Sequence, residues 1–559
     1  MRNLLLTSFM LVIFSAKLFS SGIQVLNTTV STNTDKKSAQ VKFTLMWDHS
    51  WRLESGTGPA NWDAAWVFIK FRTLPGDNWD HGYISRTASD HKMPANAAFS
   101  IGSSIAVVGG SYTQVGVGAF IHRNEPGSGT VTFTDCELYW NFTLNGLTGG
   151  EQVEVCVLAT EMVYITPHSY WLGDMTSTGT LRRNPSQGSG GLRAIESVNV
   201  AAPTPGAWMN YFSNTWITGS TNLQGANSFY PAVISSNAGA TPDDASLGNY
   251  QIRTGAAINS ASTTLYSSYS SIIHSNYPRG INAFYCMKYE ITQGEYLHFL
   301  NKNLVAVKNA GTYYPNTVPT DGRYGIKRIY NSANPSIPAE YVLEIESSAF
   351  LPCNYLNTQD VYGWLIWAGL RPMTELEFEK ICRGPEAIPA VGSQRPQYAW
   401  GSTDIQNALG YTQKGQSNEG PLAPDQNVAV SPATTVNTAI GTAGNTLDGP
   451  MRAGGFASAV SSRVTSGASY YGVMEMSGNL WERTITVGLD AGRNFQGLAN
   501  TATANGHGNG RTGPNAAPDL PVGGAWPALT GAGLGFRGGS YLDHSERARI
   551  SDRMFINHN

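Results

Sequence analysis

Charged residues are scarce in this chain, and no long run of them occurs. Asp, Glu, Lys and Arg make up 13% of the 559 residues, and the formal net charge is −3. Binding to a nucleic-acid backbone requires a clustered basic surface, which this composition does not provide. No stretch beyond the N-terminus approaches the ~18 apolar residues that a membrane-spanning helix needs. We therefore expect no nucleic-acid partner and no transmembrane segment.

Cysteine is also sparse, and no CxxC pair is present, which excludes a zinc ribbon and a thioredoxin-type site. The five cysteines are Cys136, Cys156, Cys286, Cys353 and Cys382. Alternating apolar residues predict a β-hairpin from strands 131–144 and 151–160. Packing the apolar faces of these strands together places Cys136 and Cys156 on opposite sides of the sheet, which disfavours a disulfide between them. The other three cysteines have apolar neighbours, which is typical of buried, inert thiols.

The N-terminus has the pattern of a secretory signal peptide, predicted over residues 1–21. Arg2 supplies the positive start, residues 4–14 the apolar segment, and small residues at 20–22 a cleavage zone. We expect a secreted or cell-surface protein. Residues 22–160 then show short alternating strands punctuated by Gly, Pro, Asn and Asp, which predicts an antiparallel β-sandwich module. Its tryptophans, at 47, 51, 62, 66 and 79, could form a sugar-stacking platform, although core packing is the favoured interpretation.

The pattern changes from residue 161 onward, where long polar loops at 175–275, 402–470 and 485–530 separate a few helices. Thr292 to Glu295 and Thr374 to Glu377 are capping boxes, each followed by apolar residues at helical spacing. An apolar stripe predicts a third helix over residues 358–368. The fold class expected for the whole chain is α+β.

Six ordered segments in this C-terminal part resemble motifs of the formylglycine-generating enzyme, or sulfatase-modifying factor, family. They lie at residues 161–174, 284–292 (FYCMKYEIT), 367–375 (WAGLRPMTE), 398–401 (YAWG), 472–482 (GVMEMSGNLWE) and 536–540 (FRGGS). The resemblance predicts a sulfatase-modifying-factor-like domain over residues 161–559, with the family's C-type-lectin-like fold and long loops. It says nothing about residues 22–160.

The family's oxidase converts a cysteine of target sulfatases to formylglycine at two copper-binding cysteines, and both are substituted here. The matching positions are Asp543 and Ala548, and neither supplies the thiolate that copper(I) prefers. The resemblance therefore implies that copper is not a cofactor of this chain and that no catalytic residue is retained. Acidic and histidine side chains near Asp543 could bind another metal, but pairing with Arg547, Arg549 and Arg553 is the favoured interpretation.

One metal site of the family is conserved in outline. The resemblance implies a structural calcium ion held by Glu475, Gly478, Leu480 and Glu482, through two carboxylates and two backbone carbonyls. A tight turn in which Glu482 caps backbone amides is the alternative. Six residues follow the Ser-x-Arg segment at 551–553, so the chain is expected either to be truncated or to replace the family's closing strand.

These features predict an exported, non-catalytic protein that acts as a binding or structural surface module for an unknown protein or glycan ligand. The alternative is a copper-dependent formylglycine-generating oxidase with relocated ligands, which would have to draw on Cys286, Cys353 and Cys382. A structural component of an exported surface assembly is a third hypothesis, which the sequence does not separate from the first.

Overall fold

The computed structural model of the chain describes most of the N-terminal half and the motif-bearing parts of the C-terminal half. The described residues are 22–54, 59–167, 209–210, 215–216, 233–235, 250–253, 270–273, 277–278, 280, 282–315, 319, 322–385, 398–432, 447–486, 490–493, 495, 526–527, 533–550, 552 and 555. The predicted signal peptide and residues 170–174 of the first family motif lie outside them. In the described ranges, every helix is too short or too polar to cross a membrane.

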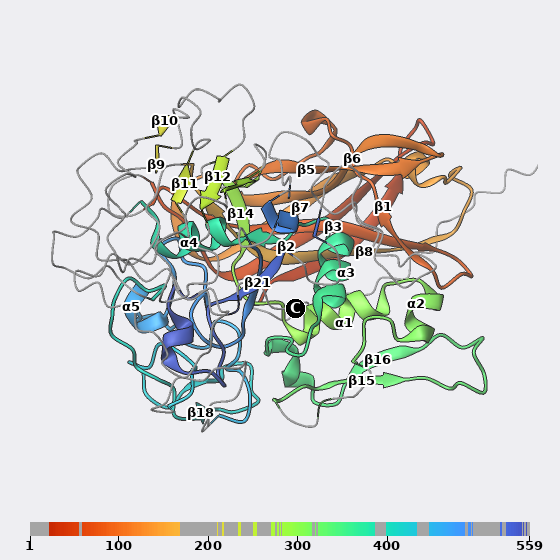
Figure 1. Cartoon of the computed structure of the whole chain (residues 1–559). Helices are drawn as coiled ribbons and strands as arrows, with labels where there is room; N and C mark the ends of the chain where they lie inside the picture. Colours follow the sequence, from red (N-terminus) through yellow and green to blue (C-terminus); the bar gives the residue numbers. More distant parts are fainter. Residues whose placement is uncertain are drawn as a thin grey trace, which may run out of the picture.

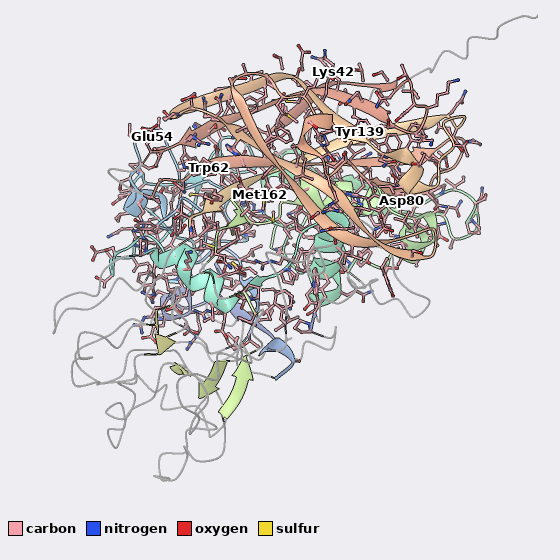
Figure 2. All side chains as sticks on the ribbon, turned by 90° about the horizontal axis from the view of Figure 1, so that it is seen from above. Lys42, Glu54, Trp62, Asp80, Tyr139 and Met162 are labelled. Atoms are coloured by element: carbon pink, nitrogen blue, oxygen red, sulfur yellow. The ribbon has the colours of Figure 1, made fainter. Side chains whose placement is uncertain are left out.

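The N-terminal region consists of antiparallel strands in two sheets that share one hydrophobic core (Figure 1). One sheet has the order β1–β2–β7, with bounds Gln24–Thr32, Ala39–Arg52 and Gly127–Trp140. The other has the order β14–β8–β3–β6–β5, with bounds Phe284–Met287, Val153–Ile165, Asp63–Thr73, Ser111–Arg123 and Ala97–Val108. β4 (Trp79–Gly82) pairs with β3, and the short 3-10 helices η1 (Ala88–Asp90) and η2 (Phe142–Asn145) lie between strands. In Figure 2, Lys42 and Tyr139 mark the first sheet, and Trp62 and Met162 mark the second sheet and its margin.

The predicted hairpin of residues 131–144 and 151–160 is wrong. β7 pairs with β2, whereas β8 pairs with β3 and β14, so the two strands belong to different sheets. Alternation identifies the buried face of a strand but not its neighbour, and η2 carries the chain from one sheet to the other. Cys136 and Cys156 are both buried and free.

The C-terminal part is mixed α and β with short elements, and it contains the three predicted helices. The helices are α1 (Gln293–Asn301), α2 (Val305–Ala310), η5 (Glu346–Phe350), α3 (Thr358–Ala368), α4 (Glu375–Arg383), α5 (Arg463–Ser466), α6 (Asp490–Arg493) and η6 (Ser545–Ala548). The strands are β9 (Met209–Asn210), β10 (Thr215–Trp216), β11 (Val233–Ser235), β12 (Tyr250–Arg253), β13 (Ser270–Ile273), β15 (Ile326–Ile329), β16 (Glu340–Leu343), β17 (Met373–Thr374), β18 (Tyr411–Thr412), β19 (Gly420–Pro421), β20 (Glu482–Ile485) and β21 (Leu534–Arg537). Both predicted capping boxes are formed, at Thr292 and at Thr374, and α3 has a third at Asn357.

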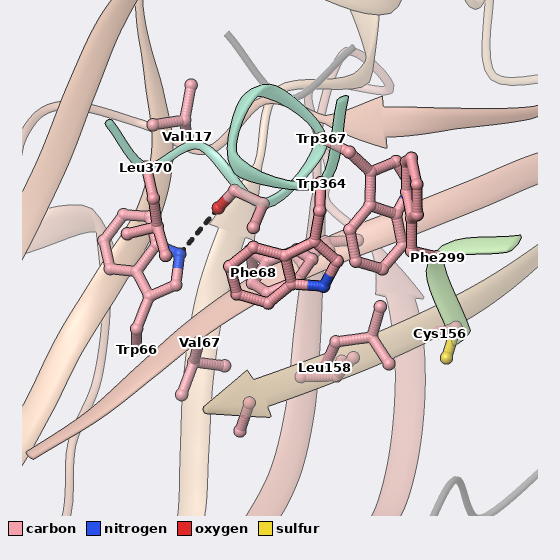
Figure 3. Close-up of a cluster of buried hydrophobic side chains, with 14 of the residues drawn as sticks. Trp66, Val67, Phe68, Val117, Cys156, Leu158, Phe299, Trp364, Trp367 and Leu370 are labelled. Carbon is pink, nitrogen blue, oxygen red and sulfur yellow. Dashed lines mark hydrogen bonds between the residues drawn. The ribbon is translucent and has the colours of Figure 1, made fainter. Parts of the chain in front are cut away.

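Helix α3 packs against the strands of the N-terminal region (Figure 3). The indole Nε1 of Trp66, on β3, donates a hydrogen bond of 2.7 Å to the carbonyl of Ala368 at the end of α3. The ring of Trp367 lies edge-on to Phe68, with 5.3 Å between centroids. Buried aromatic contacts of this kind make the two regions parts of one core.

A buried ion cluster also joins the two regions. Lys288 follows β14, and its Nζ lies 2.8 Å from Glu161 Oε2 on β8 and 3.2 Å from Asp63 Oδ2 on β3. Asp63 also accepts hydrogen bonds from Trp47 Nε1 and Ser50 Oγ, both at 2.9 Å. Burial alone would lower the pKa of Lys288, but Glu161, Tyr289 and Asp63 together more than offset it, so the pKa is raised and the amine stays charged. β8 also runs across the predicted boundary between residues 160 and 161.

Near the chain end, Phe555 lies against β21. Its carbonyl accepts a hydrogen bond of 2.9 Å from the Phe536 amide, and its ring meets Trp481 edge-on at 5.3 Å. Phe555 therefore covers part of the edge of β21, which favours the expectation that the end of the chain replaces the family's closing strand.

Candidate functional site

Asp543 and Ala548, the two positions that the resemblance matches to copper-binding cysteines, are buried. Ala548 is fully buried in an apolar cluster with Tyr398, Trp400, Val428 and Val430. Asp543 is also fully buried, and its carboxylate accepts a hydrogen bond from Ser540 Oγ. To react at these positions, a substrate cysteine would have to reach Ala548, which aromatic and aliphatic side chains shield from solvent.

The charged residues around these positions pair with one another. Arg547 forms an ion pair with Asp552, and an Nη2–Oε1 distance of 3.7 Å separates Arg549 from Glu546. His544 Nδ1 accepts a hydrogen bond of 3.1 Å from the Glu546 amide and caps η6. The interpretation of this cluster as a set of acid–arginine pairs is confirmed for these residues; Arg553 lies outside the described residues.

The remaining cysteines do not provide a thiolate pair. Cys286 and Cys382 border one apolar cluster, formed by residues of β8, α4 and the 472–482 motif, and Cys353 lies in the main core. Burial raises the pKa of all three thiols, so they are protonated at neutral pH. Copper(I) binds thiolates, and a protonated thiol in an apolar core is a poor ligand.

The predicted calcium segment forms a tight turn against β21. Gly478 and Asn479 have positive φ values of 86° and 67°, and the Gly478 amide donates a hydrogen bond of 2.7 Å to the Gly538 carbonyl. A Cβ atom at Gly538 would overlap the carboxylate of Glu482. Gly538, the first glycine of the RGGS motif, therefore allows the backbone to approach this carboxylate.

Glu475 is buried, and Glu482 is half-buried with both carboxylate oxygens shielded from solvent. Among the described residues, Glu475 Oε2 and both Glu482 oxygens have no hydrogen-bond partner. Glu475 Oε1 accepts a hydrogen bond of 2.9 Å from the Gly454 amide. Burial raises the pKa of Glu475 to about 8, and burial together with the Glu290 charge raises that of Glu482 well above its usual value. The alternative, in which Glu482 caps backbone amides, requires a hydrogen bond from an amide to its carboxylate. No such bond is present in the described part of the chain.

A third carboxylate, Glu290, borders this turn and was not predicted. Its oxygens accept hydrogen bonds of 2.8 Å from the Leu480 amide and 2.7 Å from Asn479 Nδ2. Burial and the nearby Glu475 raise its pKa. Glu290 belongs to the FYCMKYEIT motif, which identified the segment but not its contact with the turn.

The carboxylates at the turn are chemically suited to a hard cation, because unpaired buried carboxylate oxygens are costly unless protonated or bound to a cation. Within the described ranges, however, no group of three or more His, Cys, Asp or Glu side chains has the geometry of a metal site. The carboxylates of Glu475 and Glu482 are donors that suit calcium. Since they are only two side chains, backbone carbonyls would have to complete the set of ligands.

The tryptophans of the N-terminal region serve packing. Trp47, Trp66 and Trp79 are buried. Trp62 is half-buried and stacks on Tyr164 at 4.0 Å between ring centroids, with the Arg52 guanidinium over its ring at 4.6 Å. These rings are already occupied by neighbouring side chains, which agrees with core packing.

A comparison with known families matches residues 251–558 to the model described as the sulfatase-modifying factor enzyme 1-like domain. No curated protein matches the chain. The matched segment contains the buried turn, the RGGS motif and five of the six motif segments identified in the sequence. Because it covers more than half of the chain, the protein belongs to the sulfatase-modifying factor enzyme 1-like family.

Proposed function

We propose that this protein is an exported, non-catalytic member of its family that acts as a binding or structural surface module. The observation that carries the proposal is the replacement of both copper-binding positions by Asp543 and Ala548, with Ala548 sealed in an apolar cluster. Restoring copper chemistry would require two thiolates within reach of one another. The half-buried Cys286 and the buried Cys353 and Cys382 are protonated thiols and do not supply them. Export rests on the signal-peptide pattern of residues 1–21.

The fold proposed for the C-terminal part is the family's C-type-lectin-like arrangement. The mixed α and β content, the short elements and the long connecting segments support it. A scaffold of this kind displays large loops from a rigid body, which suits recognition of a protein or glycan ligand.

The proposal is tested by incubating the purified protein with copper, oxygen and a sulfatase-type Cys-x-Pro-x-Arg peptide, followed by mass spectrometry. We expect the thiol mass of the peptide to be unchanged, while an active oxidase of the family, assayed in parallel, produces the aldehyde. Formation of the aldehyde by this protein would show relocated copper ligands and overturn the proposal. Cys286→Ser and Cys382→Ser would then identify them.

We also propose that calcium stabilises the turn through Glu475, Glu482 and the carbonyls of Gly478 and Leu480. The unpartnered buried carboxylate oxygens support this. The ion would supply the charge balance that the protein side chains lack, and any ligand that binds the folded state alone raises the melting temperature.

Thermal melts test this with and without calcium and a chelator. We expect calcium to raise the melting temperature by several degrees, and Glu482→Gln to abolish that rise. Glu125→Gln, at an exposed glutamate of the N-terminal region, is the matched control and should respond as the unmodified protein does. A melting curve that neither calcium nor chelator moves would rule the site out.

A further inference from the structure

A pocket lined by tyrosines lies on the β15–β16 hairpin, which follows α2 in the chain. Its volume is about 460 Å³, and its lining includes Tyr314, Tyr324, Tyr330, Lys327, Arg328 and Glu344; we call it the tyrosine pocket. A volume of this size lies within the range typical of small-molecule sites. None of these residues belongs to the segments that resemble family motifs or to the turn proposed for calcium.

The tyrosine rings are held in place by contacts within the protein. Tyr314 donates a hydrogen bond of 3.2 Å from its hydroxyl to the Ile326 carbonyl, and its ring packs on Tyr341 at 5.5 Å. Tyr324 meets Tyr355 edge-on at 6.3 Å. The guanidinium of Arg328 lies 4.6 Å from the centre of the Tyr330 ring. Rings fixed in this way lose little conformational entropy when a ligand stacks on them.

The charges of the pocket are balanced internally. Lys327 and Glu344 form an ion pair of 3.1 Å at the rim, where both side chains are more than half exposed. Arg328 Nη2 donates hydrogen bonds to the carbonyls of Lys308 and Asn309. A small anion or cation would have to displace one of these partners. The lining instead offers aromatic faces beside polar groups that both donate and accept hydrogen bonds.

The geometry points to the tyrosine pocket as a binding site for a neutral saccharide, an inference that rests on the proposal that this protein is a binding module. A pyranose ring has apolar C–H faces that stack on aromatic rings, and hydroxyls that exchange hydrogen bonds with groups such as Lys327 and Glu344.

The test uses an array of neutral hexose and N-acetylhexosamine oligosaccharides, followed by calorimetric titration of the strongest binder into the full protein. We expect binding that weakens about tenfold or more in Tyr330→Ala, because the variant lacks the stacking ring, and changes less than about threefold in Tyr330→Phe. Tyr112→Ala, at a tyrosine 69% exposed on the distant β5–β6 turn, is the matched control and should bind as the unmodified protein does.

The inference is overturned if the array retains no neutral oligosaccharide. It is also overturned if Tyr330→Ala binds the oligosaccharide as tightly as the unmodified protein does. A melting curve establishes that each variant is folded, and Lys327→Ala, at an exposed rim residue, provides a second variant that should weaken binding severalfold. Decaproline is included because aromatic grooves also bind polyproline; its binding in place of a saccharide would overturn the saccharide assignment. The copper and peptide assay is independent of these results, so a failure here leaves the non-catalytic proposal standing.

Discussion

At the residue scale, the buried cluster of Lys288 with Glu161 and Asp63 joins the N-terminal and C-terminal regions by charge. We expect Lys288→Met to destabilise the protein by about 3–5 kcal/mol, because it leaves two buried carboxylates without their cation. Urea denaturation measures the change.

Lys42→Met is the matched control for this substitution. Lys42, at the surface of the first sheet (Figure 2), forms a 2.8 Å ion pair with Asp135, and the two side chains are 45% and 70% exposed. Exposed pairs contribute little, so this variant should be as stable as the unmodified protein. Equal stability of both lysine variants would show that the buried cluster does not hold the two regions together.

Asp360 predicts a pH dependence of stability. It lies in the capping box of α3, where Oδ2 accepts a 2.9 Å hydrogen bond from the Asn357 amide, and Oδ1 has no partner among the described residues. Burial raises the pKa of Asp360 to about 6, against an ordinary value of about 3.9. Between these pH values the folded state binds more protons than the unfolded state. The contribution of Asp360 to the free energy of unfolding is therefore present at low pH and is lost as the pH rises through about 6.

We therefore expect Asp360→Asn to flatten the fall in stability between pH 4 and pH 6. The amide oxygen can still accept the hydrogen bond from Asn357, and the variant has no charge to bury. Urea midpoints of both proteins across this range measure the difference, which is on the order of 2–3 kcal/mol for the charge alone. Parallel curves for the two proteins would contradict the assignment.

At the scale of secondary structure, a pair of glycines allows β5 and β6 to receive the side chain of Trp66. Gly102 and Gly118 are opposite one another, and a Cβ at Gly118 would lie 2.6 Å from the Trp66 ring. We expect Gly118→Ala to cost about 1–3 kcal/mol, because the ring that bonds to α3 would have to move. Gly127→Ala, whose Cβ would meet Arg123 at 3.6 Å, should be neutral in the same denaturation experiment. Equal stability of the two variants would contradict this role of the glycines.

Local signals predicted the helices but not the partners of the strands. Capping boxes depend on residues three apart, and those at Thr292 and Thr374 are visible in the sequence and present in the structure. Strand pairing depends on residues far apart, which is why the pairing of β7 was mispredicted. The same limit applies to Glu290, which meets the turn at residues 475–482 although it lies far from that turn in the sequence.

At the scale of the whole molecule, the candidate sites were predictable to different degrees. The loss of the copper cysteines could be read at two positions, Asp543 and Ala548, because the surrounding motifs establish the alignment. The burial of Ala548 could not be predicted from the sequence, because Tyr398 and Val428 pack against it from distant segments. The tyrosine pocket lies outside every motif and depends on the pairing of β15 with β16, so no sequence pattern pointed to it.

The N-terminal and C-terminal regions should fold as one unit. β14 and β8 belong to the sheet of the N-terminal region, Lys288 is neutralised by Asp63 and Glu161, and α3 packs on Trp66 and Phe68.

A fragment of residues 153–559 keeps β8 and β14 but exposes the faces that β3 covers. We expect it to lack a cooperative thermal transition and to bind a dye that detects exposed apolar surface, and adding the 22–152 fragment should reduce that binding. Residues 22–559 serve as the reference. A 153–559 fragment that melts cooperatively within a few degrees of the reference would mean that the family domain is autonomous, and that the contacts with β3 serve orientation more than folding.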